Sequence, residues 1–113
     1  MLKNVSKSIA INKGYRIILY LMLPEVNLNL YKYFLAVIEE KSVSKAAEKL
    51  CVSQPTVSYN LHELQRALQE KLFVVERTGV VPLPRALLLY QRLKPTYNHL
   101  LKTIQIFTQE AEG

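Results

Sequence analysis

The chain has 113 residues, half of them apolar and 21% charged, which predicts one globular domain with a modest core rather than a disordered chain. Its formal net charge of +6 permits an anionic partner without requiring one. The only cysteine, Cys51, excludes an intramolecular disulfide and a cysteine-based metal site. We expect it to be a small buried residue at a helix end, with a redox-sensing thiol as the alternative. His62 and His99 lie far apart, and no catalytic triad or carboxylate pair stands out, so we expect no enzyme, cofactor or metal.

Residues 1–26 contain an apolar run, YRIILYLML, at positions 15–23. At about nine residues, this run is too short to cross a bilayer, which needs roughly 20. Basic residues precede it as in a signal peptide, but no small-x-small cleavage site follows. Pro24 would end any helix or strand here before the next element begins. We therefore expect no membrane association, and membrane association through residues 15–23 remains the alternative.

The stretch from Asn27 to Glu40 predicts the first long helix. Apolar residues recur there at i, i+3, i+4, i+7 and i+8, namely Leu30, Tyr33, Phe34, Val37 and Ile38. Asn27 or Asn29 can cap its start, and Lys41-Ser42 closes it. This helix is expected to belong to the core and to support the elements that follow.

The stretch from Ser42 to Leu64 contains two short helical patterns joined by a tight turn at residues 51–53. The first is capped by Ser42 or Ser44 and carries apolar residues at helical spacing, Val43, Ala46, Ala47 and Leu50. The second has Ser53 at the N-cap, Pro55 in its first turn, and an apolar stripe of Val57, Leu61, Leu64 and Leu68. Because Ala46 and Ala47 are small, the second helix can cross closely over the first, as in a helix-turn-helix.

A family resemblance rests on these residues. Ser44-Lys45-Ala46-Ala47, then Leu50, then VSQPTVS at 52–58 resemble the DNA-binding domain of LysR-type bacterial transcriptional regulators. LYKYFLAV at 30–37 and Leu72-Phe73-Val74 fit the same family at the same offsets. The resemblance covers residues 27–86 and extends more weakly to the C-terminus. It implies a mainly α fold, a winged helix-turn-helix followed by a long C-terminal dimerisation (linker) helix.

The resemblance also divides the chain. Residues 27–84 correspond to the winged helix-turn-helix DNA-binding domain and residues 85–113 to the linker helix. Regulators of this family begin a few residues before their first helix, where Met22 stands. Residues 1–26 are therefore an extension of doubtful origin, either an over-read reading frame with its true start at Met22 or a short appended element. The family's effector-binding domain is expected to be absent, which leaves a fragment or a naturally short protein.

By resemblance, the helix from Gln54 to about Gln69 is the recognition helix, whose start enters the major groove of DNA. The Gln54 amide suits adenine, and Pro55 and Thr56 offer carbon surface to a thymine methyl group. Ser58 can donate to a base or a phosphate, and Tyr59 can stack on a sugar or reach a phosphate. Many relatives carry arginine at the Tyr59 position, where it takes guanine, so we expect a different base preference here.

Two residues before the recognition helix are expected to face the DNA backbone. Ser44 and Lys45 lie in the first turn of the preceding helix, where a phosphate is favoured. For Ser44 a capping role is the alternative, for His62 an idle surface position, and Lys49 is the weaker phosphate candidate. The predicted DNA-binding residues are Ser44, Lys45, Gln54, Pro55, Thr56, Ser58, Tyr59, His62 and Arg77.

Residues 72–84 predict a short hairpin, the wing of this family. Phe73-Val74-Val75 and Val80-Val81 are β-branched or aromatic runs, and Thr78-Gly79 lies between them as the turn. Relatives usually carry arginine two residues after the phenylalanine, but Val75 stands there. Arg77 is the residue that can take over contact with DNA, and the departure weakens the expected contact of the wing.

From Arg85 onward the resemblance predicts the linker helix. Its apolar residues alternate spacings of four and three, as in a coiled-coil seam: Ala86, Tyr90, Leu93, Tyr97, Leu100, Ile104, Phe107 and Ala111. We expect homodimer contacts at Tyr90, Leu93, Tyr97, Leu100, Ile104 and Phe107, with packing back onto the first helix as the alternative. Pro95 is expected to kink this helix near Leu93-Lys94 or to divide it in two.

The resemblance implies sequence-specific binding of double-stranded DNA by a cytoplasmic, dimeric transcription factor without a sensor domain. Its operator would be partly palindromic, and mixed dimers with a full-length relative are a further expectation. The alternative is an interaction module that modulates a full-length relative without binding DNA itself. The small charge excess and the altered wing favour that alternative.

Overall fold

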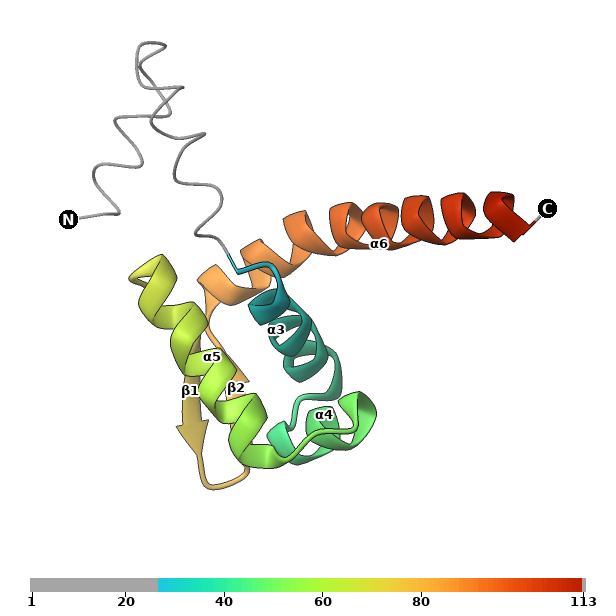
Figure 1. The fold of residues 1–113 in the computed structure, drawn as a ribbon. Coiled ribbons are helices and arrows are strands. Elements are labelled where there is room, and N and C mark those ends of the chain that lie inside the picture. Colours follow the sequence, from blue (N-terminus) through green and yellow to red (C-terminus); the bar gives the residue numbers. More distant parts are fainter. Residues whose placement is uncertain (1–26, 113) are drawn as a thin grey trace, which may run out of the picture. The chain divides into compact units, whose positions relative to one another are not determined.

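The computed structural model describes residues 27–112, so the expectations for residues 1–26 lie outside the described residues. The elements are α3 (Asn29–Glu40), α4 (Val43–Leu50), α5 (Gln54–Leu68), β1 (Phe73–Glu76), β2 (Gly79–Pro82) and α6 (Pro84–Glu112) (Figure 1). The order confirms the predicted mainly α winged helix-turn-helix followed by a long helix. Contacts divide the chain between Lys71 and Leu72 into two units.

In the first unit, α3 is the core helix. The Asn27 side chain accepts the N–H of Asn29 at 3.0 Å, but the N-cap residue is Leu28 and it makes no side-chain capping hydrogen bond, so the prediction of an asparagine N-cap is wrong. At the other end Lys41 adopts a left-handed conformation, φ 56°, and its N–H donates to the Val37 carbonyl at 2.8 Å. Leu35 and Ala36 are buried beside the predicted stripe, so α3 is covered on more than one side. Its central side chain, Phe34, is fully buried.

The helix-turn-helix forms because each helix end is closed by its own residues. Ser42 accepts the N–H of Lys45 at 3.1 Å and so caps α4. At the end of α4, Val52 donates its N–H to Ala47 O at 3.0 Å, which closes the helix and turns the chain. Ser53 then accepts the N–H of Thr56 at 3.2 Å as the predicted cap of α5. The helices α3, α4 and α5 contact one another (Figure 1).

Cys51 differs from its prediction as a buried residue. It is exposed, and it lies in a left-handed conformation with φ 58° and ψ 44° as the C-cap of α4. Its N–H donates to the carbonyls of Ala47 and Glu48. At this position the backbone N–H closes α4, and the side chain points into solvent because the chain reverses direction here.

The second unit begins with the predicted hairpin. The strands β1 and β2 pair antiparallel, with Phe73 opposite Pro82 and Glu76 opposite Gly79. This register makes Arg77-Thr78 the two-residue loop, so the prediction of a Thr78-Gly79 turn is wrong by one residue. Gly79, the first residue of β2, has φ 137°, which a residue with a side chain adopts only at a cost.

The hairpin is joined directly to α6. Leu83 donates its N–H to Leu72 O at 2.8 Å across the base of the hairpin, and its own carbonyl accepts from Ala86 at 2.9 Å. The hairpin therefore groups with α6 by contacts, whereas the sequence grouped it with the helix-turn-helix in residues 27–84. The division at residue 84 between a DNA-binding domain and a linker helix stays a prediction.

The helix α6 runs unbroken from Pro84 to Glu112, so the predicted division into two pieces at Pro95 is wrong. Pro95 removes the N–H that would bond the Gln91 carbonyl. Gln91 is exposed, so water can satisfy that carbonyl, and the next turn is reinforced by the Thr96 hydroxyl, which donates to Arg92 O at 3.5 Å. Within residues 27–112, no helix combines the length and apolarity needed to cross a membrane.

Candidate nucleic-acid interface

The helix α5, which the sequence predicted as the recognition helix, has a buried face and an exposed face. Its buried residues are Val57, Leu61 and Leu64, which are 0, 6 and 1% exposed. Five of the six predicted residues on this helix are exposed, namely Gln54, Pro55, Ser58, Tyr59 and His62, and Tyr59 is 64% exposed. Arg66 and Ala67 are exposed as well. Five of the predicted residues therefore lie together on one surface of a helix whose opposite face packs into the core.

Hydrogen bonds separate the polar residues of α5 into two groups. Thr56 is half-buried, and its hydroxyl lies 2.8 Å from the Ser53 hydroxyl, while the Asn60 amide donates to Thr56 O at 2.7 Å. Both residues make hydrogen bonds within the helix start, so the Thr56 hydroxyl is partly occupied while its methyl group stays free for an apolar contact. The side chains of Gln54, Ser58, Tyr59 and His62 make no hydrogen bond to another described residue.

The first turn of α4 presents Ser44 and Lys45. Ser42 is the cap, and the Ser44 hydroxyl lies 3.1 Å from the Ser42 hydroxyl, so Ser44 supports the cap without forming it. Both Ser44 and Lys45 are exposed. Lys45 forms no ion pair with any residue of the described range. Its charge, at the start of a helix, is available to an anion.

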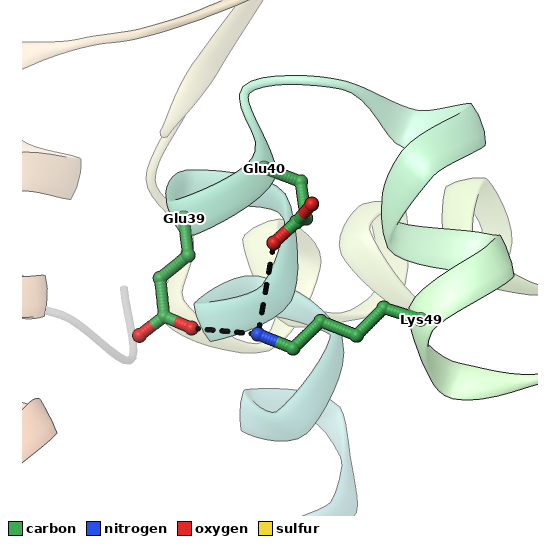
Figure 2. A network of polar contacts seen from close by, with 3 residues as sticks. All are labelled: Glu39, Glu40 and Lys49. Carbon is green, nitrogen blue, oxygen red and sulfur yellow. Dashed lines mark hydrogen bonds and ion pairs between the residues drawn. The ribbon is translucent and has the colours of Figure 1, made fainter.

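Lys49, on the last turn of the same helix, is held by two carboxylates (Figure 2). Its Nζ lies 3.2 Å from Glu39 Oε1 and 3.7 Å from Glu40 Oε2. The hydrogen bond to Glu39 and the negative charges raise the pKa of Lys49 above its usual value. These contacts connect α4 to the end of α3. Because Lys49 already binds two carboxylates, it is a poorer phosphate ligand than Lys45.

Arg66 is a residue that the sequence reasoning missed. On α5 it forms two hydrogen bonds with Glu63, from Nε at 3.2 Å and from Nη2 at 3.1 Å. The hydrogen bond to Glu63 is the main cause that raises the pKa of Arg66. The spacing of three residues between opposite charges on a helix was the signal that could have found the pair.

Arg77 belongs to the second unit and is exposed in the hairpin loop beside exposed Glu76. The valine at the position where relatives carry arginine, Val75, is 83% exposed. No ion pair involving Arg77 or Glu76 occurs among residues 27–112. The hairpin tip thus carries one charge of each sign, and its net electrostatic pull on a phosphate is small.

The predicted dimerisation residues lie along α6 and become more exposed towards its end. Tyr90, Leu93 and Tyr97 are half-buried, whereas Leu100, Ile104 and Phe107 are 45, 54 and 72% exposed. A contiguous apolar stripe of this exposure on a helix is typical of a surface that a partner covers. The part of the chain that the structure describes holds no cluster of three or more His, Cys, Asp or Glu side chains suited to a metal.

Known proteins match this chain over the helix-turn-helix. Residues 28–87 match the family described as bacterial regulatory helix-turn-helix protein, lysR family. The transcriptional regulator CysL of Bacillus subtilis is 43% identical over 63 residues, which are 56% of this chain and 21% of CysL. BenM of Acinetobacter baylyi is 38% identical over 60 residues, 53% of this chain and 20% of BenM.

A solved structure agrees with the sequence match. The crystal structure of the BenM DNA-binding domain with catB site 1 DNA covers 78% of this chain and 99% of that domain, with 30% identity and a TM-score of 0.70. This chain spans about a fifth of the length of the curated relatives that it matches. The match to more than half of its residues, together with the shared fold, shows that the chain belongs to the LysR family of bacterial helix-turn-helix regulatory proteins.

Proposed function

We propose that this protein binds double-stranded DNA sequence-specifically as a transcriptional regulator. The observation that carries the proposal is the exposed face of α5, where the polar side chains of Gln54, Ser58 and Tyr59 make no hydrogen bond to another described residue. Groups of this kind at the start of a recognition helix suit the edges of base pairs in the major groove. The structural likeness to a DNA-binding domain crystallised with DNA supports the same function.

The residues divide into base contacts and backbone contacts. Gln54 would accept from and donate to adenine, Pro55 and the Thr56 methyl would contact thymine, and Ser58 would donate to a base edge. Tyr59 and His62 would reach the sugar or phosphate. Ser44 and Lys45 would bind a phosphate at the start of α4, and Arg77 would add a contact from the wing. Backbone contacts fix the position of the protein, and base contacts select the sequence.

The stripe on α6 supports a homodimer. Leu100, Ile104 and Phe107 alternate by four and three residues, so they recur on one side of the helix. A two-fold dimer would present two copies of α5 to half-sites about one helical turn apart, which requires a partly palindromic operator. The same stripe could pair with a longer member of the family. A bacterial DNA-binding protein of this kind would act in the cytoplasm.

Selection from a pool of random duplexes tests the function. The protein is incubated with the pool at moderate salt, and the retained duplexes are sequenced after several rounds. Enrichment of a two-fold related sequence pair is the expected result. Recovery of no preferred sequence, although the protein remains folded and dimeric, would contradict the proposal and favour an interaction module that acts on a longer relative.

A pair of lysine variants tests the assignment of the backbone contact. Lys45→Gln is expected to weaken binding to all duplexes alike and to reduce the slope of log K against log salt by about 0.9, since one phosphate contact is lost. Lys49→Gln is the matched control, because Glu39 and Glu40 already neutralise Lys49. Fluorescence anisotropy across a salt series gives both slopes. An unchanged slope in Lys45→Gln would remove Lys45 from the interface.

Charged substitutions on α6 test the dimer. The double variant Leu100→Glu, Ile104→Glu places two carboxylates on each copy of the apolar stripe, and we expect a monomer at concentrations where the wild type is dimeric. Gln109→Glu, on another side of the helix, adds a charge outside the stripe and should leave the dimer intact. Sedimentation velocity measures the association state. A dimer that persists in the double variant would locate the contact elsewhere.

A further inference from the structure

Arg66 extends the exposed face of α5 one turn beyond His62. Pro55, Tyr59, His62 and Arg66 follow one another by four, three and four residues, and all four are exposed. This spacing places them on one side of an α-helix, away from buried Val57, Leu61 and Leu64. Arg66 therefore lies on the same surface as the proposed DNA contacts, and its side chain is 73% exposed.

The pair with Glu63 fixes the guanidinium and leaves part of it unused. Arg66 donates to Glu63 from Nε and Nη2, which occupies two of its five N–H groups. The remaining three, two on Nη1 and one on Nη2, stay available for a second acceptor. Glu63 is less exposed than Arg66, 26% against 73%, so the carboxylate lies nearer the protein and the guanidinium further out.

Distance along the helix indicates which acceptor Arg66 can reach. It lies 11 residues beyond Pro55, which is about 16 Å at 1.5 Å per residue. The major groove is about 12 Å wide, so for a helix that crosses it this position would lie past the bases that the helix start contacts. A group at that place meets the sugar-phosphate backbone at the edge of the groove. A guanidinium donates to phosphate oxygens with two parallel hydrogen bonds.

We infer that Arg66 is a DNA phosphate contact at the far edge of the groove, held in position by Glu63. The inference rests on the proposed function, because it requires α5 to lie in the groove. The contact would fix how far the recognition helix extends across the groove and would add affinity without sequence preference. Because Glu63 balances its charge, Arg66 would act through the N–H groups that Glu63 leaves unused rather than through a net positive charge on α5.

The test compares Arg66→Gln, Arg66→Lys and the wild type on the selected duplex and on a scrambled duplex across a salt series. Arg66→Gln is expected to weaken binding to both duplexes by the same factor and to reduce the salt slope by about 0.9. Arg66→Lys keeps the charge but not the two-bond geometry, so it should retain the slope and bind more weakly than the wild type. Lys49→Gln serves again as the control.

The outcomes separate the two claims. An unchanged slope and affinity in Arg66→Gln, with normal specific binding by the wild type, would overturn the role of Arg66 and leave the proposed function standing. In that case the pair only stabilises the helix, and thermal unfolding would report its loss. A wild-type protein with no preference for the selected duplex would instead reject the proposed function itself.

Discussion

Replacing Gln54 and Ser58 together by alanine is expected to abolish most of the preference for the selected duplex over a scrambled one. Each good base contact contributes about 1–3 kcal/mol of discrimination, so two contacts give on the order of 100-fold or more. Binding to the scrambled duplex should change little, because neither side chain carries a charge. Titration of both duplexes at one salt concentration measures the preference.

The structure indicates that this double variant should lose base contacts without losing the fold. Both side chains are exposed and make no hydrogen bond to another described residue, so their loss should leave α5 intact. Surface substitutions of this kind change stability by about 0.5 kcal/mol or less. Binding to the scrambled duplex acts as the internal control for folding. Undiminished preference in the double variant would show that other residues read the sequence.

Replacing Phe34 by alanine is expected to lower the free energy of unfolding by about 3–5 kcal/mol. Phe34 is fully buried in α3, the helix that α4 and α5 both contact, so its ring lies in the core behind the helix-turn-helix. Truncation leaves a cavity that the surrounding side chains fill only in part. Urea unfolding followed by circular dichroism measures the loss, at one fixed protein concentration because the proposed dimer would contribute to stability.

Two comparisons support the interpretation of that result. Phe34→Leu keeps an apolar side chain of similar size and should lose much less stability than Phe34→Ala. Tyr59→Ala removes an aromatic ring that is 64% exposed on α5 and should change the free energy of unfolding by only about 0.5 kcal/mol. Similar losses in Phe34→Ala and Tyr59→Ala would mean that Phe34 is not the centre of the core.

The features that local chemistry determines could be predicted from the sequence. The apolar stripes of α3 and α5 located both helices, and Ser53 with Pro55 located the start of α5 within one residue. The exposed face of α5 follows from the same arithmetic, because a helix with one buried stripe presents its other residues outward. The resemblance to the LysR family then supplied the order of the hairpin and the long helix.

The features that depend on backbone geometry could not be predicted from the sequence. Cysteine is usually a buried residue type, but at position 51 the left-handed cap of α4 leaves the side chain exposed. The hairpin turn was displaced by one residue, because Gly79 serves the second strand instead of the loop. Pro95 was expected to kink α6 near Leu93-Lys94 or to divide it; the helix is not divided, because the carbonyl of exposed Gln91, which loses its donor, can bond water. Arg66 was missed because its importance comes from its contact with Glu63.

One measurement tests the central claim most directly, namely binding of the wild-type chain to its selected duplex and to a scrambled duplex from low to high salt. The proposed function predicts that affinity for both falls as salt rises, while the selected duplex stays at least about 1,000-fold tighter. Weak binding with equal affinity for the two duplexes and no dependence on salt would contradict it. In that case the exposed face of α5 does not read DNA, and the apolar stripe of α6 becomes the surface through which the protein acts.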